Sequence, residues 1–416
     1  MHTIQPPASA RRYSIFALTR RAGFALTLAF LLICVNASSA ENPPSNEPNV
    51  QFRGSLDNCR IRFEKEKRGT VAFIGGSITE MNGYRPMVCD LLKRRFPTTD
   101  FKFIDAGVSS TCSTTGAFRL ESDVLSKGPI DLFFIEFAVN DDQDAGHTRA
   151  ECIRGMEGII RHARRGNPNM DIVVTYFVNE GMLATFKSGK TPLTVEAHEV
   201  VAKHYDISTI NLAREISQEL ESKKLTWKQY GGVHPAPFGN AICSHMIDKL
   251  LSQAWLSPLG AEAKITPLAM PAEPLDPLNY ERGRFIDPAD AKITDGWTIG
   301  VPDWKKLPGG KRERFTSIPM LTATELGAEL TLKFDGTAIG AYVVAGPDAG
   351  IVEGSIDGMA FEPVDLFHRF SRGLHYPRTV MFAADLKKGE HTLTLRMSKE
   401  TRSAGHAARI MDFVAN

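Results

Sequence analysis

The chain has 416 residues, of which 43% are hydrophobic, and its formal net charge is +1. A chain of this length can bury more than one hydrophobic core, so we expect two domains. The near-neutral charge and the lack of a basic block argue against a nucleic-acid partner. After the first forty residues there is no run of the roughly 18 apolar residues that a membrane-spanning helix requires.

Residues 1–40 have the pattern of a secretory signal peptide. Four arginines and no acidic residue accompany an apolar stretch, residues 22–35, which is followed by the small residues 37–40. This pattern predicts cleavage after Ala40 and export to the periplasm or the extracellular space, with no stable membrane insertion afterwards. Cleavage would remove four positive charges and leave a net charge of about −3. The polar residues that follow, 41–55, are expected to form a disordered leader.

Residues 56–257 alternate between apolar runs and helical patterns. Apolar strands that are each followed by a helix predict a doubly wound α/β fold, in which helices cover both faces of a parallel sheet. The expected strands are 71–75, 101–105, 131–137, 171–177 and 207–212. The expected helices lie near 86–96, 117–126, 150–164, 194–204, 213–223 and 238–252.

A proline-rich segment, residues 258–282, is predicted to be a linker to a second domain. From 283 to 416 the pattern changes to short alternating runs separated by turn residues, including Asp335-Gly336 and Asp357-Gly358. Such runs predict an antiparallel β-sandwich of the jelly-roll kind.

Three polar residues follow predicted elements in an order that suggests an activated hydroxyl nucleophile. Ser77 lies in a Gly-Gly-Ser-Ile-Thr block directly after one apolar run, and Asn140 follows another. His234 lies in a Gly-Val-His-Pro block more than 150 residues after the serine. Ligands bind beyond the carboxyl ends of parallel strands, which is where Ser77 and Asn140 are expected. A histidine can accept the proton of a serine hydroxyl at neutral pH.

These blocks resemble those of the SGNH (GDSL-type) hydrolase superfamily, and the resemblance covers about residues 68–255. It implies a flavodoxin-like fold with Ser77 as the nucleophile, His234 as the base and the Asn140 side chain as an oxyanion donor. The oxyanion glycine of the family falls on Ser110, whose backbone N–H would take that role. The resemblance requires no metal and no organic cofactor.

The largest departure from the family pattern is at Gly231, where the family has an aspartate three residues before the histidine. Without that carboxylate, a backbone carbonyl of residues 230–232 is the first candidate to orient His234, which would leave a Ser–His dyad. The alternative is a carboxylate from another loop, Asp142 or Asp144, which would rebuild a triad.

Glu80, Asn82 and Arg85 follow the nucleophile closely and are candidate substrate-binding residues. Polar groups there suit a sugar ester better than a long acyl chain, so we expect an exported carbohydrate esterase that removes small acyl groups, notably acetyl. Helix capping by Asn82 and a surface ion pair of Glu80 with Arg85 are equally good interpretations. A lipase or acyltransferase of the same fold, or a binding protein whose hydrolase site has decayed, are the alternative functions.

Five cysteines would remain after cleavage, and their spacing matches no zinc motif. The odd number leaves at least one thiol free. In the C-terminal domain Trp297, Trp304 and Tyr376 are candidates for stacking on sugars, although aromatic residues of a small sandwich usually belong to its core.

Overall fold

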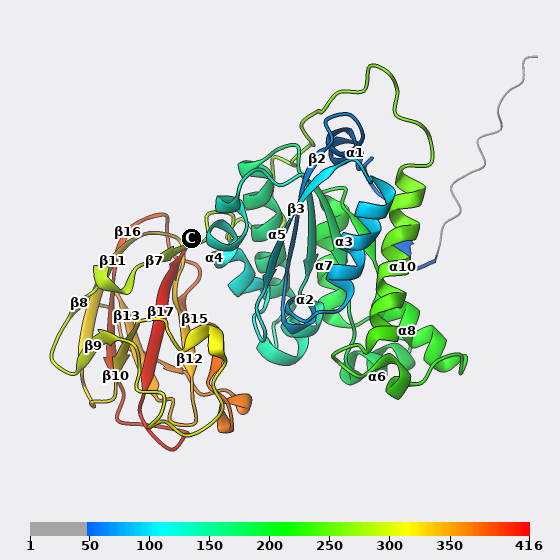
Figure 1. The fold of residues 1–416 in the computed structure, drawn as a ribbon. Coiled ribbons are helices and arrows are strands. Elements are labelled where there is room, and N and C mark those ends of the chain that lie inside the picture. The colour runs from blue at the N-terminus through cyan, green and yellow to red at the C-terminus, as the bar shows by residue number, and fades with distance from the viewer. Residues whose placement is uncertain (1–47) are drawn as a thin grey trace, which may run out of the picture. The chain divides into compact units, whose positions relative to one another are not determined.

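The computed structural model describes residues 48–416 (Figure 1). The predicted signal peptide and most of the predicted leader lie outside these residues. Among the helices that are described, none is both long and apolar enough to cross a membrane. The five cysteines of this part, Cys59, Cys89, Cys112, Cys152 and Cys243, are all buried and free.

The N-terminal half is built around a six-stranded sheet in the order β1-β6-β5-β4-β2-β3. All its neighbouring strands are parallel except β1, which runs antiparallel to β6. Without β1, this is the flavodoxin-like order, which confirms the predicted fold class. The strands are β1 Val50–Gln51, β2 Arg68–Gly75, β3 Asp100–Gly107, β4 Leu132–Glu136, β5 Asp171–Thr175 and β6 Ser208–Ile210.

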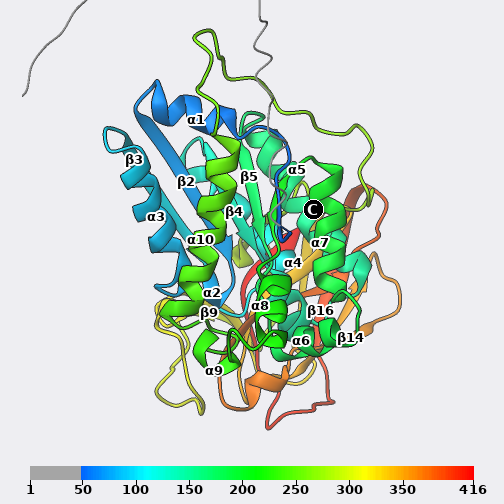
Figure 2. The same cartoon turned by 90° about the vertical axis from the view of Figure 1, so that its right-hand side faces the viewer.

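Helices cover both faces of this sheet, with α3 and α10 on one face and α4, α5 and α7 on the other (Figures 1 and 2). Strands β4 and β5 are buried along their whole length, as this double cover requires. The helices are α1 Asp57–Glu64, α2 Ser77–Glu80, α3 Tyr84–Arg95, α4 Ser113–Asp123, α5 Arg149–Gly166, α6 Glu180–Lys187, α7 Leu193–His204, α8 Leu212–Glu221, α9 Trp227–Tyr230 and α10 Pro237–Ala254.

The C-terminal part consists of two antiparallel sheets that enclose a second core. One sheet has the order β15-β12-β17-β10-β9, with β7 also paired to β17, and the other has the order β14-β13-β16-β11-β8. The strands are β7 Arg284–Ile286, β8 Lys292–Ile293, β9 Trp297–Gly300, β10 Met320–Ala323, β11 Glu329–Gly336, β12 Ile339–Ala345, β13 Ile351–Ile356, β14 Glu362–Asp365, β15 Tyr376–Ala383, β16 Gly389–Met397 and β17 Ala408–Ala415. Antiparallel packing was the expectation for this segment.

The proline-rich segment between the two parts contains neither helix nor strand, yet it is bonded to the α/β part along its length. The Asn58 side chain bonds to both the N–H and the carbonyl of Thr266. The carboxylate of Glu157, on α5, accepts hydrogen bonds from the N–H groups of Leu275 and Asp276. These bonds dock the segment against the α/β part.

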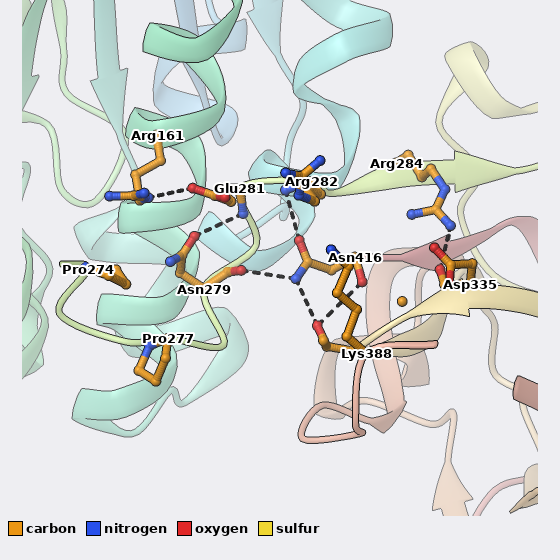
Figure 3. A pocket seen from close by; sticks show the side chains of 12 residues that line it. Arg161, Pro274, Pro277, Asn279, Glu281, Arg282, Arg284, Asp335, Lys388 and Asn416 are labelled. Atoms are coloured by element: carbon orange, nitrogen blue, oxygen red, sulfur yellow. Dashed lines mark hydrogen bonds and ion pairs between the residues drawn. The ribbon is translucent and has the colours of Figure 1, made fainter. Parts of the chain in front are cut away.

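The end of this segment is fixed by the C-terminal residue. The Asn416 side chain donates to the Asn279 carbonyl at 3.0 Å and accepts from the Arg282 N–H at 2.9 Å. Figure 3 shows these bonds beside a cavity of about 330 Å³ that α5, the segment and the C-terminal part line together. None of the candidate site residues predicted above lines this cavity.

Several short elements were not expected from the sequence, among them β1, α1, α6 and α9. Val50–Gln51, expected within a disordered leader, pairs with Ile210 and Thr209 as strand β1. Two residues are too few to show an alternating pattern, and they become ordered because an edge strand of the sheet offers unpaired backbone groups. Helix α6 was also not expected, although Asn179 caps it by accepting from the Met182 N–H.

Candidate active site

Ser77 lies at the carboxyl end of β2, as the first residue of the four-residue helix α2. The N–H of a first helical residue has no partner within its helix. The preceding residue, Gly76, donates its N–H to the buried Glu136 carboxylate at 2.9 Å, which fixes the turn. The Ser77 side chain is half-buried at the end of the sheet (Figure 1 shows α2 there).

His234 lies in the loop between α9 and α10, and its imidazole reaches the serine. Its Nε2 lies 2.7 Å from the Ser77 Oγ, a normal hydrogen-bond distance. The histidine is exposed. The structure therefore brings together the predicted nucleophile and the predicted base from positions 157 residues apart.

Neither of the groups predicted to orient His234 does so in this structure. Within residues 48–416, no group forms a hydrogen bond to its Nδ1. The Tyr230 carbonyl, one of the predicted acceptors, is bonded to the Ala236 N–H at 2.8 Å. Asp142 accepts from the Asn179 side chain and Asp144 from the Asn140 side chain. The geometry is that of a Ser–His pair without a third member.

Asn140 begins a π-helical turn, η2 (Asn140–Ala145), after β4. Its side chain packs directly on Gly76, because a Cβ placed on that glycine would lie 2.2 Å from the Asn140 Oδ1. The amide Nδ2 donates to the Asp144 carboxylate at 2.8 Å, and this bond uses only one of its two N–H groups. The second N–H forms no hydrogen bond in the described part of the chain and remains available as a donor.

Ser110 lies in the loop after β3 and has a φ of +72°, the left-handed conformation that glycine adopts most easily. Position 110 therefore keeps a backbone conformation typical of glycine, although the residue is a serine. Its N–H donates to no acceptor among residues 48–416. Its carbonyl and hydroxyl are both bonded to residues of the C-terminal part.

The three predicted substrate-binding residues differ in their hydrogen-bond and ion-pair partners. Glu80 accepts hydrogen bonds from the N–H and the hydroxyl of Ser109 and pairs with Arg314. Burial raises its pKa, but the bonds from Ser109 outweigh this and lower it below the ordinary value. Arg85 pairs with Asp105 at 2.7 Å instead of with Glu80. Asn82 is exposed, and α3 begins without a side-chain cap, so the alternative interpretation of Asn82 as a helix cap is wrong.

Two buried charged residues beneath the site had not been predicted. Glu136, fully buried, accepts from Gly76 N–H and from the Thr79 hydroxyl, and burial raises its pKa to about 7. Arg119, 1% exposed, donates to the carbonyls of Gly75 and Ala106 at 3.0 and 2.7 Å. These bonds tie the ends of β2 and β3 together. An acidic residue ending an apolar strand was the one available signal for Glu136.

Asp141, next to Asn140, is the centre of a buried polar cluster that includes His147 and His198, with Cys112 and Cys152 nearby. Such side chains are metal ligands in other proteins. Here the Asp141 carboxylate already accepts from the N–H and hydroxyl of Ser113 and lies 2.9 Å from His198 Nε2. A metal ion would have to displace these partners, so the cluster fits a structural network better.

The aromatic residues considered for sugar stacking are mostly inside the protein. Trp297 is 4% exposed and Tyr376 is 2% exposed, so neither offers a ring face at the surface. Trp304 is half-buried and packs edge-on against His375. The stacking role is therefore wrong for Trp297 and Tyr376.

The assembled groups suit acyl transfer through a serine. A hydroxyl bonded to an imidazole can attack a carbonyl carbon, because the imidazole accepts the proton as the bond forms. Among the described residues, the N–H groups of Ser77 and Ser110 have no acceptor. Together with the Asn140 amide, they are donors of the type that stabilises the resulting oxyanion.

Comparison with known proteins gives a family for the segment that holds these residues. Residues 73–242 match the GDSL-like Lipase/Acylhydrolase family. No curated protein matches the chain.

A solved two-domain esterase, described as active on acetylated mannans, has a similar fold. In its crystals with mannopentaose the identity is 20% and the TM-score 0.69, over 88% of this chain and 96% of that chain. A second crystal structure under the same description gives 21% and 0.66, over 88% and 97%. At these identities the likeness extends to the fold, including the C-terminal antiparallel sheets.

Proposed function

Since residues 73–242 belong to the GDSL-like lipase/acylhydrolase family, we propose that this protein is a serine esterase that removes acetyl or other small acyl groups from carbohydrate. The observation that carries the proposal is the 2.7 Å contact between Ser77 Oγ and His234 Nε2. Ser77 is the proposed nucleophile and His234 the proposed base.

The proposed reaction has two halves. The Ser77 oxygen bonds to the ester carbonyl carbon while His234 accepts its proton. The tetrahedral intermediate collapses, the C–O bond to the sugar breaks, and the sugar oxygen takes the proton from His234. Water then attacks the acyl-serine with His234 again as base, which releases the carboxylic acid and restores the serine hydroxyl.

The proposed oxyanion hole consists of the Ser77 and Ser110 N–H groups and the Asn140 side chain. Losing one such donor typically costs about 2.7–4 kcal/mol of transition-state stabilisation. The amide N–H of Asn140 that its bond to Asp144 leaves unused and the left-handed conformation of Ser110 support these two assignments.

The carbohydrate substrate is supported by the polar surroundings of the nucleophile. Glu80, Asn82 and Arg85 follow Ser77 within eight residues, and Asn82 is exposed. The similar two-domain esterase is described as active on acetylated mannans, which makes an acetylated polysaccharide the class to test first. No observation here favours a lipase or a decayed binding protein.

We also propose that the protein acts after export, because residues 1–40 have the pattern of a signal peptide. The proposed division places the hydrolase at 56–257, the docked proline-rich segment at 258–282 and the sandwich at 283–416.

The test uses the chain from residue 41 onward and a fluorophosphonate that labels active serines. We expect one label per molecule, none on Ser77→Ala, and full labelling of the control Ser126→Ala, an exposed serine bonded only to the Ser122 carbonyl. Wild type should also release acetate from an acetylated glycan. Stoichiometric labelling of Ser77→Ala would reject the nucleophile. Hydrolysis of long-chain esters alone would favour a lipase.

A further inference from the structure

The loop that carries Ser110 is bonded to the C-terminal antiparallel part through one arginine. Arg312 donates from Nη1 to the Ser109 carbonyl and from Nη2 to the Ser110 Oγ, both at 2.8 Å. These partners are more than 200 residues apart in the sequence. A guanidinium presents its donors in a rigid plane, so two bonds to adjacent residues fix their relative orientation.

Fixing this loop matters because Ser110 has an unfavourable backbone conformation. A residue with a Cβ at φ +72° is less stable than in the extended or right-handed helical regions. Without an external restraint, the loop would relax and its N–H would change direction. The Arg312 bonds hold the Ser110 hydroxyl and the carbonyl of the Ser109–Ser110 peptide, and the N–H of that peptide has no acceptor among the described residues.

The other proposed oxyanion donor, the Asn140 side chain, is connected to the C-terminal part through Asp144 and Tyr376. The Tyr376 hydroxyl donates to one oxygen of the Asp144 carboxylate, and the other oxygen accepts from the Asn140 Nδ2 at 2.8 Å. Tyr376 is itself held, because its ring stacks on His368 with centroids 4.5 Å apart. It begins strand β15 of the antiparallel sheet.

The carboxylate contact fixes the rotamer of the Asn140 amide. An amide side chain can rotate by 180° and present either its oxygen or its nitrogen. A carboxylate accepts but does not donate, so Asp144 selects the orientation with Nδ2 toward itself. The second N–H of the same nitrogen has no acceptor among the described residues and remains available to an oxyanion, while the Oδ1 lies against Gly76.

We propose that Arg312 and Tyr376 are positioning residues, through which the C-terminal antiparallel part sets the two oxyanion donors, Ser110 N–H and Asn140 Nδ2. This inference rests on the proposed esterase function. It assigns the C-terminal part a role in the chemical step, in addition to any contact with a glycan. The hydrolase segment alone would then fold with a poorly ordered oxyanion hole.

The test measures kcat and KM on p-nitrophenyl acetate, a substrate too small to contact a glycan-binding surface. The variants are Arg312→Met, Arg312→Lys and Tyr376→Phe in the full mature chain. Loss of one oxyanion donor typically lowers kcat by roughly 10²–10³-fold. Misplacing a donor should cost less, so we expect kcat to fall at least about tenfold in Arg312→Met and Tyr376→Phe with KM nearly unchanged. Arg312→Lys should recover part of the loss.

Two matched variants control for damage to the antiparallel part. Tyr342→Phe removes a hydroxyl that forms no hydrogen bond within residues 48–416, from a buried tyrosine of β12. Arg284→Met removes an arginine whose guanidinium donates to the Asp335 carbonyl. Both should keep wild-type kcat. Thermal unfolding of every variant separates misplacement of the donors from loss of the fold.

The outcomes distinguish this inference from the proposed function. Wild-type kcat in folded Arg312→Met and Tyr376→Phe overturns the positioning role and leaves the esterase intact. A loss confined to an acetylated glycan, with p-nitrophenyl acetate unaffected, also overturns it and indicates substrate contact instead. If the wild-type protein neither hydrolyses esters nor reacts with a fluorophosphonate, the proposed function fails and this inference fails with it.

Discussion

Gly231 lies so close to Ala236 that a Cβ on the glycine would be 2.0 Å from the Ala236 nitrogen. The glycine ends α9 with a φ of +108°, a conformation that residues with a side chain rarely adopt. The position at which the family has its catalytic aspartate therefore has no room for one here. The backbone of this loop therefore excludes a carboxylate side chain at position 231.

We predict that Gly231→Asp will not improve the esterase. The new side chain requires the backbone at Ala236 to move, so the variant should unfold at lower temperature and hydrolyse p-nitrophenyl acetate more slowly than wild type. Thermal unfolding and kcat/KM measure the two effects. A folded Gly231→Asp protein with tenfold higher kcat/KM would show that the loop can still accept a triad.

Asp142 is one of the two carboxylates that we considered for a rebuilt triad. It bonds to the Asn179 side chain at 2.7 Å and not to His234. Asp142→Asn should therefore change kcat by only a few-fold, whereas replacing a triad aspartate by asparagine costs roughly 10⁴-fold. The value of kcat on p-nitrophenyl acetate measures this effect. A loss near 10⁴-fold in folded Asp142→Asn would mean that His234 recruits this carboxylate during turnover.

Substitutions at Ser110 can separate the role of its backbone conformation from that of its hydroxyl. Ser110→Gly keeps the left-handed turn and the Arg312 bond to the Ser109 carbonyl, so kcat should fall by less than about tenfold. Ser110→Val places a β-branched residue at a φ of +72°, where such residues are outliers. It should lower kcat much further. If Ser110→Gly were the less active of the two, the hydroxyl would matter more than the turn.

The sequence predicted the part of this site that depends on strand ends. Ser77 and Asn140 follow buried strands, and parallel strands place their carboxyl ends at one edge, so their proximity followed from the pattern. His234 was found by its Gly-Val-His-Pro block. The contact at 2.7 Å agrees with that prediction, whereas the catalytic roles still await experiment.

The supporting residues could not be found in the same way. Arg312 and Tyr376 act on loops more than 200 residues away, and nothing in a local pattern shows which loop a sandwich residue contacts. Tyr376 begins a strand and is buried, so it has the features of an ordinary core tyrosine. Gly231 was recognised as a departure, but its positive φ and its contact with Ala236 exist only in the folded loop.

Acyl chain length provides a test of the proposed substrate class. Ser77 is half-buried and His234 is exposed, and the polar residue Asn82 lies on the surface close by in the sequence. A lipase gains about 0.8 kcal/mol for each methylene that its acyl tunnel buries. We expect no such gain, and p-nitrophenyl acetate should be a better substrate than the octanoyl ester by kcat/KM. A steep rise with chain length would contradict the carbohydrate-esterase proposal.

The buried carboxylate of Glu136, beneath the turn that carries Ser77, makes the stability of the folded protein depend on pH. Its carboxylate is fully buried, and one of its oxygens, Oε2, has no hydrogen-bond partner within residues 48–416. Burial raises its pKa from 4.5 to about 7. Between these two values the folded protein binds the proton and the unfolded chain does not. The contribution of Glu136 to stability is therefore greatest at low pH and falls as the pH rises toward 7.

We predict that Glu136→Gln will remove this part of the pH dependence. Glutamine can still accept from the Gly76 N–H and the Thr79 hydroxyl, but it cannot ionise. Between about pH 5.5 and pH 8 wild type should lose roughly 2 kcal/mol more of its unfolding free energy than the variant. Urea denaturation at the two pH values measures this, with the exposed Glu390→Gln as control. Asp171, also buried with a pKa raised to about 7, contributes equally to both proteins, so the difference isolates Glu136. Equal pH dependence in wild type and Glu136→Gln would mean that Glu136 keeps an ordinary pKa in the folded protein.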